Sequence, residues 1–546
     1  MRTAIYAGVS ALALTAAAPL FAQATVPADC TGVTGNCSVI DSAGDDNTVT
    51  VDQDGAGNVS EVLQDATGAN ASVTQDGNGN LSNVDQTDDE VTLTDPNAIV
   101  TQTGDLNTSD VTQTAAGVGS NGLLATVSQT DGATSIVNQT ANGADANSLT
   151  ATVTQIGTVS SEINQTVNGD NATNFNATVD QNGANLSSVI NQSDTGNNDQ
   201  IQNATVTQTG ADNTSTVDQI NRRQNATVLQ TGANGTSQVL QTGQRNTADV
   251  IQAGDGNFVD IDQSNNRHDA FVQQHSGSSD NTAEVIQAGN SRNDASIFQF
   301  GTNSGAGISQ TVNARNDTAV IIQNAGADDS GAGIFQTGAL PGNVNTDNAA
   351  LIDQDGGTLN ASVIEQSGED NVAESIQNGS FNFSSIIQSG IGNDVFVDQI
   401  DDVTPGPADG NFSEVEQAGD GNIINVSMAG NDGIARTFQY GGSTNTVTTT
   451  QTGDGNESQV EQSFAGGDNN EATITQSGLG NTSIIAQGNN LLSDLNIATI
   501  DQQGDDNLSL LAQDGTSNNA EVNQLGNGST SDITQNGVGN TVTVNQ

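Results

Sequence analysis

The sequence contains no tryptophan and no lysine, and it is poor in aromatic residues and proline. Only 3% of its 546 residues are aromatic, six are proline, and all eight cationic side chains are arginine. Against these stand 64 acidic residues, so the net charge is −56. Nucleic-acid binding requires a basic surface that faces the phosphates, so this charge balance excludes it. The shortage of aromatics also disfavours a polysaccharide-processing β-helix enzyme.

Long apolar runs are missing as well, apart from residues 4–18, which follow Arg2. This run is too short to span a bilayer and is typical of a secretory signal peptide. Residues 22–24 fit a small-residue cleavage site, so we expect a signal peptide at residues 1–24 and a mature chain that begins at Thr25. The sequence therefore predicts a secreted, extracellular protein without membrane insertion.

Cysteine and histidine are nearly absent, which limits the chemistry that the chain can support. Cys30 and Cys37 lie close together in an exported segment, and this predicts a small disulfide loop. The only histidines, His268 and His275, lie far from this loop in the sequence and are expected to be exposed turn residues. No catalytic constellation stands out from the repeat background. We therefore expect no metal site, no cofactor and no enzymatic activity.

The dominant feature is a repeated phrase, Asn-x-small-x-aliphatic-x-Gln, followed by a short gap that contains glycine. It reads Asn-Thr-Ala-Asp-Val-Ile-Gln at residues 246–252 and Asn-Phe-Val-Asp-Ile-Asp-Gln at residues 257–263. The terminal Gln recurs from Gln53 to Gln546, mostly every eleven residues, and Met428 replaces it once. Such self-similarity predicts a solenoid.

The alternation inside the phrase distinguishes strand from helix. Alternate side chains of a strand share a face, so Asn246, Ala248, Val250 and Gln252 are predicted to point inward. An eleven-residue repeat also fits three turns of a right-handed helical supercoil. However, the period of two, the glycine in the gaps and the abundance of Thr, Val, Ile and Asn favour strands joined by tight arcs.

The spacing of the rungs indicates how many strands make one turn. Between Gln86 and Gln208 the spacing alternates between 16 and 10 or 11 residues, so the insertions fall on every second arc. Two strands per turn place these insertions along one edge. The sequence thus predicts an all-β fold, a two-sided parallel β-solenoid of about twenty turns with ~22 residues per turn. It would comprise residues 47–546, preceded by a leader at residues 25–46.

Identical amides at equivalent positions are expected to stack along the solenoid, as in cross-β ladders. A buried amide without a partner costs about 1–3 kcal/mol, which explains why Asn and Gln recur at fixed positions. The predicted ladder residues are Asn47, Gln53, Asn58, Gln64, Asn246, Gln252, Asn257, Gln263, Asn540 and Gln546.

The segments at residues 53–58, 241–246 and 252–257 resemble the curlin repeat, Gln-x-Gly-x-x-Asn followed by small and aliphatic residues that lead to another Gln. The resemblance covers nearly all of residues 47–546. It implies a subunit of curli-like fibres, the extracellular functional amyloids of the bacterial biofilm matrix. A curli-type secretion pore and a nucleator subunit would be its partners. Because this chain has more repeats than the major and minor curlin subunits, the roles of nucleator, long adhesin or single-chain rod stay open.

Open strand edges recruit further strands, so we expect copies to stack head to tail through residues 47–53 and 540–546. Such a contact does not close and would generate filaments.

A second hypothesis is a monomeric β-solenoid surface adhesin. It would depend on cations if Asp-Gly arcs, such as residues 54–58, bound calcium as nonapeptide repeats do. Their period differs from that of nonapeptide repeats, so acids such as Asp255 and Asp505 are expected to form a solvated face.

Overall fold

The computed structural model describes residues 26–88, 95–171, 173–194, 196, 201–338, 346–400, 410–462, 467–488 and 494–546. The predicted signal peptide lies outside the described residues. The chain divides into two compact units, Met1–Gln263 and Ser264–Gln546, which are considered separately below. The described part contains a single 3-10 turn, η1 (Ala28–Cys30), and otherwise strands. None of its helical segments is long and apolar enough to cross a membrane.

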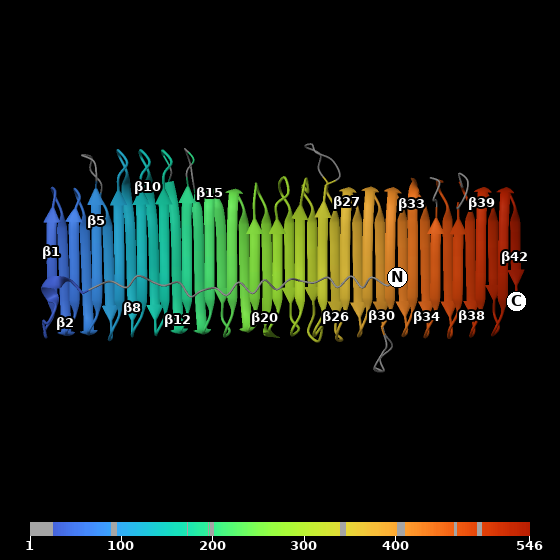
Figure 1. The fold of residues 1–546 in the computed structure, drawn as a ribbon, viewed down its shortest axis with the longest axis horizontal. Coiled ribbons are helices and arrows are strands. Elements are labelled where there is room, and N and C mark those ends of the chain that lie inside the picture. Colours follow the sequence, from blue (N-terminus) through green and yellow to red (C-terminus); the bar gives the residue numbers. More distant parts are fainter. Residues whose placement is uncertain are drawn as a thin grey trace. The chain divides into compact units, whose positions relative to one another are not determined.

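In both units consecutive strands alternate between two parallel sheets (Figure 1). In the first unit the odd-numbered sheet contains β1 (Cys37–Ala43), β3 (Val59–Asp65), β5 (Leu81–Asp88), β7 (Thr108–Ala115), β9 (Thr134–Ala141), β11 (Ser160–Val167), β13 (Ser187–Asp194), β15 (Thr214–Arg222), β17 (Thr236–Gln244) and β19 (Phe258–Gln263). The even-numbered sheet contains β2 (Thr48–Ala56), β4 (Asn70–Asn78), β6 (Asn97–Thr103), β8 (Asn121–Thr130), β10 (Asn147–Ile156), β12 (Thr173–Ala184), β14 (Gln202–Ala211), β16 (Gln224–Gln230) and β18 (Thr247–Asp255).

The second unit repeats this arrangement. Its even-numbered sheet contains β20 (Asp269–Ser279), β22 (Asp294–Gln299), β24 (Thr318–Gln323), β26 (Ala349–Asp355), β28 (Val372–Asn378), β30 (Asp394–Ile400), β32 (Ile423–Ala429), β34 (Thr446–Thr452), β36 (Glu471–Ser477), β38 (Ile497–Gln503), β40 (Asn519–Gln524) and β42 (Thr541–Asn545). Its odd-numbered sheet contains β21 (Thr282–Gln287), β23 (Gly305–Thr311), β25 (Gly331–Thr337), β27 (Ala361–Glu369), β29 (Phe383–Ile391), β31 (Phe412–Asp420), β33 (Ile434–Ser443), β35 (Glu457–Gln462), β37 (Thr482–Gln487), β39 (Leu508–Thr516) and β41 (Thr530–Val538).

Within a unit each strand pairs in parallel with the strand two places along the chain. Val51 of β2 lies beside Val73 of β4, and Val62 of β3 lies beside Val84 of β5. Equivalent residues are 22 apart in these narrow turns and 26 or 27 apart in the wider ones. Two strands therefore make one turn, and the predicted two-sided parallel β-solenoid is confirmed.

The core of each unit is a thin layer between its two sheets. In β18 the side chains of Ala248, Val250 and Gln252 are buried, whereas Thr247 and Asp249 on the opposite face are partly exposed. Branched aliphatic side chains suit such a pleated, enclosed surface. Each buried Val or Ile contributes about 1.5–3 kcal/mol of hydrophobic stabilisation relative to an exposed one.

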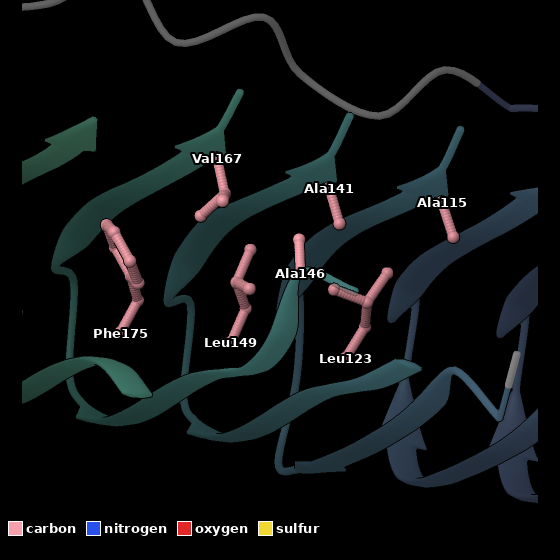
Figure 2. Packing of buried hydrophobic residues seen from close by; sticks show 7 residues of the cluster. All are labelled: Ala115, Leu123, Ala141, Ala146, Leu149, Val167 and Phe175. Atoms are coloured by element: carbon pink, nitrogen blue, oxygen red, sulfur yellow. The ribbon is translucent and has the colours of Figure 1, made fainter. Parts of the chain in front are cut away.

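The wide turns between β7 and β12 contain a second apolar cluster. Leu123, Leu149 and Phe175 are register partners on successive even strands and are fully buried. Figure 2 shows them pointing across the turn toward a row on the odd strands, Ala115, Ala141 and Val167. The inserted residues therefore lengthen the strands and enlarge the core.

The segment predicted as a leader, residues 25–46, contains a strand. Strand β1 pairs with β3 over its whole length, from Cys37 beside Val59 to Ala43 beside Asp65. Ser42 is the register partner of Gln64, so this rung has Ser in the position that Gln fills in nearly every other rung. A search of the sequence for the terminal Gln therefore does not find this first rung.

Candidate functional site

Buried glutamines near the strand ends form a hydrogen-bonded ladder in each sheet of each unit. In the even sheet of the first unit Gln53 Nε2 donates to Gln75 Oε1 at 2.7 Å, and Gln75 Nε2 donates to Gln102 Oε1 at 2.8 Å. In the odd sheet Gln64 Nε2 donates to Gln86 Oε1 at 2.9 Å. In these bonds the donor lies in the earlier turn, so the ladders have a direction.

The Nε2 group of most of these glutamines also donates a hydrogen bond across the core. Gln53 Nε2 donates to the carbonyl oxygen of Cys37 at 3.3 Å, and Gln75 Nε2 donates to that of Val59 at 3.0 Å. These carbonyls belong to the first residues of β1 and β3, in the opposite sheet. One amide thus links successive turns and also links the two sheets, which satisfies its buried donors and acceptor.

The other predicted glutamines occupy the same ladders. Gln252 accepts a hydrogen bond from Gln230 at 2.6 Å, and Gln263 accepts one from Gln241 at 2.9 Å. In the second unit Gln546 accepts a bond from Gln524 at 3.0 Å.

The asparagines act mainly on the arcs rather than on one another. Asn58 Nδ2 donates to the carbonyl oxygens of Asp54 and Gly77, at 2.8 and 2.9 Å. Its Oδ1 accepts the backbone N–H of Asn80 in the next turn at 3.0 Å. The side chain therefore closes its own arc and pairs a backbone group that would otherwise be buried without a partner.

The remaining predicted asparagines share this role to different degrees. Asn47 Nδ2 donates to the carbonyl oxygen of Ala43 at 2.6 Å, and its Oδ1 accepts the backbone N–H of Ala69 at 2.9 Å. Asn246 Nδ2 donates to the carbonyl oxygen of Thr242 at 3.0 Å. Asn257 is buried, and Asn540 Nδ2 donates to Asn518 Oδ1 at 3.0 Å.

The asparagine positions are interrupted in the first unit, which the repeat phrase does not predict. Ala133, Val159 and Leu186 stack as an apolar cluster where the neighbouring turns of the odd sheet have Asn. The glutamine ladder continues through these turns, for example from Gln129 to Gln155 at 3.0 Å. Apolar packing thus replaces the arc hydrogen bonds of Asn, whereas the amides of Gln are retained.

The prediction that His268 is an exposed turn residue is wrong. His268 is fully buried, and the backbone N–H of Asn293 donates to its Nδ1 at 3.4 Å. Burial lowers the pKa of His268 to about 4, so its ring is neutral near pH 7. His275 is exposed on β20, where its ring contacts Phe300.

Aspartates in the arcs accept backbone hydrogen bonds from the preceding turn. Asp255 Oδ1 accepts the N–H of Ala233 at 2.9 Å, and Asp505 Oδ1 accepts that of Leu479 at 3.0 Å. The arcs leave the regular strand ladder, so these carboxylates supply acceptors that the backbone lacks there. Among the described residues, no group of three or more His, Cys, Asp or Glu side chains could hold a metal ion.

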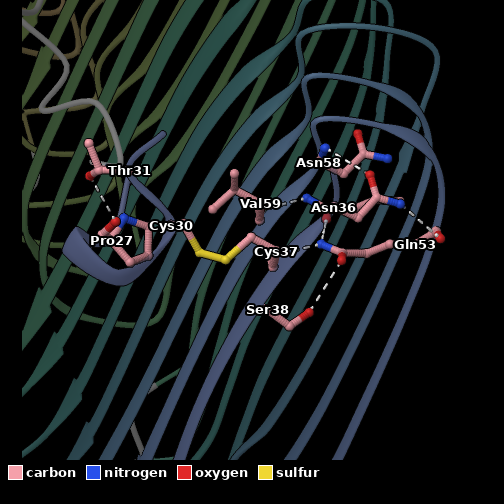
Figure 3. The surroundings of a disulfide bond; sticks show 10 residues. Pro27, Cys30, Thr31, Asn36, Cys37, Ser38, Gln53, Asn58 and Val59 are labelled. Atoms are coloured by element: carbon pink, nitrogen blue, oxygen red, sulfur yellow. Dashed lines mark hydrogen bonds between the residues drawn. A yellow bond between two sulfur atoms is a disulfide. The ribbon is translucent and has the colours of Figure 1, made fainter. Parts of the chain in front are cut away.

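The first turn is held by the disulfide between Cys30 and Cys37, whose Cα atoms are 5.8 Å apart (Figure 3). Next to it Asn36 Nδ2 donates to the carbonyl oxygen of Gln53 at 3.2 Å. Asn36 Oδ1 accepts the backbone N–H of Asn58, 22 residues later, at 3.1 Å. Asn36 thus fills the Asn position of the first rung, and its spacing from Asn58 is the sequence signal for this rung.

Hydroxyl groups replace amides at the beginning of the ladders. Ser38 Oγ donates to Gln53 Oε1 at 3.3 Å, and Ser42 Oγ donates to Gln64 Oε1 at 3.1 Å. The Oε1 atom of each of these first glutamines therefore has a hydrogen-bond donor within the chain.

The inward side chains of this first turn are incompletely covered. Ile40 is 51% exposed, whereas Val62 one turn further is 0% exposed. Val49 and Val51 of β2 are half-buried. No described strand packs on this face of the first turn, which leaves an apolar, strand-lined surface.

The even ladder of the second unit has one interruption. Met428 of β32 stands in the Gln position and is 1% exposed. Its thioether cannot donate a hydrogen bond, and Gln451 Oε1 in the next turn has no partner within the described residues.

Comparison with known protein families locates the repeat in the sequence. The model of the curlin associated repeat matches residues 44–87, 494–526 and 504–537. Among curated proteins, none matches this chain. The curlin repeat is typical of curli-like structural proteins and is associated with extracellular surface fibres. The resemblance to the curlin repeat is thus confirmed, and the chain carries curlin associated repeats in both of its units.

Proposed function

We propose that this protein is a secreted structural protein that self-assembles into curli-like extracellular amyloid fibres for biofilm matrix and surface adhesion. The observation that carries the proposal is the uncovered first turn of the solenoid. Its inward side chain Ile40 is half-exposed, although the same position in the next turn is fully buried. The curlin associated repeats supply the second line of support.

The proposed mechanism of growth is the addition of strands to this turn. Among the described strands, β1 pairs only with β3 and β2 only with β4, so one backbone edge of each faces outward. Unpaired strand edges recruit further strands. A second copy stacked there would also bury Ile40, Val49 and Val51, each worth about 1.5–3 kcal/mol when fully buried. Because this head-to-tail contact does not close, it would extend into a filament.

Export and nucleation complete the proposal. The signal peptide at residues 1–24 would direct the chain out of the cytoplasm, and a curli-type secretion pore and a nucleator subunit are the proposed partners.

A second candidate function is a monomeric β-solenoid surface adhesin. It is favoured by the observation that the amide ladders of each unit are completed within a single chain.

A pair of substitutions in the first turn tests the proposal. Ile40→Asp places a charge on the inward face, whereas Thr50→Asp places the same charge on the exposed outer face of β2. We expect filament elongation to slow about tenfold or more for Ile40→Asp. Burying a charge in the contact between two copies weakens their association by more than about 1.4 kcal/mol. Thr50→Asp should elongate at nearly the rate of the unchanged protein, as followed by thioflavin fluorescence and electron microscopy.

Circular dichroism of both variants checks that the β-solenoid is retained. Equal elongation rates for Ile40→Asp and Thr50→Asp would show that growth does not use the first turn. If the unchanged protein never forms filaments, the adhesin becomes the better account.

A further inference from the structure

One row of outward side chains on the odd-numbered sheet of the second unit alternates between apolar and acidic residues. The row crosses neighbouring strands from β25 to β35, and each member is the register partner of the next. We call it the alternating row, and its members in order are Phe335, Glu365, Ile387, Glu416, Phe438 and Glu461. All of them lie on the face of the sheet that points away from the core.

The alternating row presents a regular pattern to solvent. Phe335 is 45% exposed and Ile387 is 41% exposed, although neither has a structural need to be apolar on this outer face. Neighbouring parallel strands are ~4.8 Å apart, so the carboxylates recur at roughly 10 Å with an apolar side chain between them. Exposed apolar side chains in such an arrangement mark a binding surface.

Stacked aromatic rings lie on the same face of the same strands. Phe383 of β29 and Phe412 of β31 are register partners, and their ring centroids are 5.1 Å apart with an interplanar angle of 10°. Phe438 of the alternating row is stacked with Tyr440, at 6.1 Å and 4°. These flat apolar surfaces are ordered before any ligand arrives, which lowers the entropy cost of binding.

A cationic group already lies on this face. The Cζ atom of Arg436 is 5.4 Å from the centroid of the Phe412 ring, within the range of a cation–π contact. Its Nη1 group donates to Glu457 Oε1 at 3.1 Å, and its Nε atom lies 3.8 Å from Glu414 Oε2. An aromatic ring and two carboxylates thus hold a guanidinium, which shows that the residues of this face suit a positively charged group.

Acidic side chains on this face exceed the single positive charge. Arg436 is the only Arg or Lys on β25–β35, whereas its two glutamate partners and the three glutamates of the alternating row give five negative charges against one positive charge. The Tyr440 hydroxyl donates to Glu416 Oε2 at 2.7 Å. Burial is the main cause that raises the pKa of Tyr440 to about 12, so the hydroxyl keeps its proton at neutral pH and holds this carboxylate in place.

We propose that the alternating row and the adjacent aromatic rings bind an extended β-1,4-linked polysaccharide of amino sugars. Each sugar of such a polymer is turned over relative to the next, so amino groups reach the same side at every second sugar. A pyranose unit has nearly the length of the strand spacing, so these ammonium groups meet the glutamates of every second strand. The apolar C–H faces of the intervening sugars pack on Ile387 and on the ring of Phe438.

The charge and shape of this face disfavour other partners. The excess of carboxylates repels an acidic polysaccharide and a second copy of this chain, whose net charge is −56. A basic peptide would supply positive charge but no flat apolar ring face. The inference rests on the proposed role in surface adhesion, for which it names the class of ligand, and it does not require filament growth.

Calorimetric titration of the mature protein with a hexamer of glucosamine tests the proposal in mildly acidic buffer, where the sugar amino groups are protonated. We expect the triple substitution Glu365→Gln, Glu416→Gln and Glu461→Gln to weaken binding about tenfold or more. The matched control is Glu284→Gln, Glu374→Gln and Glu471→Gln, which removes the same charge at outward positions of the second unit outside the row and should leave binding unchanged.

A second variant tests the apolar half of the pattern. Ile387→Ser with Phe438→Ser keeps every charge and should also weaken hexamer binding about tenfold, while the dependence of binding on salt stays the same. Circular dichroism and thermal unfolding of each variant check that the solenoid is retained. The hexamer of N-acetylglucosamine, which has the same backbone without the ammonium groups, should bind the unchanged protein about tenfold more weakly or not at all.

Equal binding by the row variant and its matched control would overturn the proposal, and so would equal affinity for the two hexamers. Tighter binding of hexalysine through the same glutamates would also overturn it, because the partner would then be a basic protein segment. Protein that binds the glucosamine hexamer but never forms filaments would support this proposal and contradict end-to-end growth. Filaments that bind no hexamer would overturn this proposal and leave end-to-end growth intact.

Discussion

At the scale of single residues, the glutamine amide explains why one residue type recurs at the same position in nearly every strand. Its Nε2 group donates both along the axis and across the core, as Gln53 does to Gln75 and to Cys37. Asparagine is one methylene shorter, so at the other end of the strand it bonds to the adjacent arc. Neither task can be performed by a thioether, and Met428 is therefore a weak point in the even ladder of the second unit.

Met428→Gln should strengthen this ladder. The new Nε2 group would donate to Gln451 Oε1, which has no hydrogen-bond partner within the described residues. Leaving such a group unpaired costs about 1–3 kcal/mol, so we expect a gain of about 1 kcal/mol after the loss of the methionine packing. Slower hydrogen exchange of the amides in β32 and β34 would report the gain locally.

The reverse change in an intact part of the same ladder is the matched control. Gln476 accepts from Gln451 and donates to Gln502, both at 2.9 Å. Gln476→Met should accelerate exchange in β36 by breaking both bonds. If Met428→Gln accelerates exchange as well, the ladder geometry described for β32 and β34 is incorrect.

Asp317 is a second residue that differs from the residue type usually found at its position in the repeat, which is Asn. It is fully buried in an asparagine position, and its Oδ1 accepts hydrogen bonds from Thr346 Oγ1 at 2.6 Å and from the backbone N–H of Asn348 at 2.8 Å. Its Oδ2 has no partner within the described residues, where an asparagine would have a donor. Burial is the main cause that raises the pKa of Asp317 from 3.8 to about 6.

This shift makes the stability depend on pH. The folded state binds the proton of Asp317 more tightly than the unfolded state, so stability falls as the pH rises from 3.8 through about 6. At pH 7 the ionised carboxylate costs the fold about 3 kcal/mol. We expect Asp317→Asn to raise stability by up to this amount at pH 7 and to have little effect near pH 4. Denaturant unfolding at both pH values measures the difference.

An exposed substitution, Asp76→Asn, controls for the loss of one negative charge. If Asp317→Asn changes the stability equally at pH 4 and pH 7, the raised pKa of the buried Asp317 carboxyl is contradicted.

At the scale of secondary structure elements, the arcs are as constrained as the strands. In the first unit Gly157, Gly183, Gly210 and Gly232 lie above one another in successive turns. A Cβ atom on Gly210 would lie 2.2 Å from the carbonyl oxygen of Gly232, and its φ is +107°. The glycine of the repeat is thus required by the close approach of stacked arcs as well as by the backbone conformation.

Gly210→Ala should therefore destabilise the first unit by about 1–3 kcal/mol, because the arc backbone must move away from its neighbour. Gly277→Ala is the control, since nothing lies within 4 Å of its Cβ position and its φ is not left-handed. That substitution should be neutral or slightly stabilising. Similar losses of thermal stability in the two variants would contradict the close stacking of the arcs.

Much of the architecture could be predicted from the sequence, because both periodicities are visible there. The alternation within residues 246–252 indicates strands, and the alternating gap lengths between Gln86 and Gln208 indicate two strands per turn. The terminal Gln leads directly to side chains that the structure places in the ladders. These features depend on spacing alone and need no knowledge of packing.

Other features depend on contacts that spacing does not reveal. Ser42 replaces Gln in the first rung, where Asn36 and its distance to Asn58 are the remaining signal. Leu123 and Phe175 look like loop residues in the insertions, yet they form a core across a wide turn. His268 is buried because it fills a ladder position, which its chemical type does not suggest.

At the scale of the whole molecule, each unit combines a strongly directional interior with an acidic exterior. The amide ladders pair the buried glutamine amides of successive turns along the axis, so these amides of the inner turns have no need of another chain. The first turn is different, because Ile40 and the inward side chains of β2 are partly uncovered. Interaction between copies is therefore expected at the first turn, while the acidic sheet faces keep copies apart.

The most direct test of this account is electron microscopy with fibre diffraction of the purified mature protein, residues 25–546, followed over time without additives. The account predicts unbranched filaments with a strand repeat of roughly 4.7–4.8 Å along the filament axis, appearing without a change in secondary structure. Discrete particles that never join at any protein concentration would contradict it, because the first turn would then not recruit a second copy.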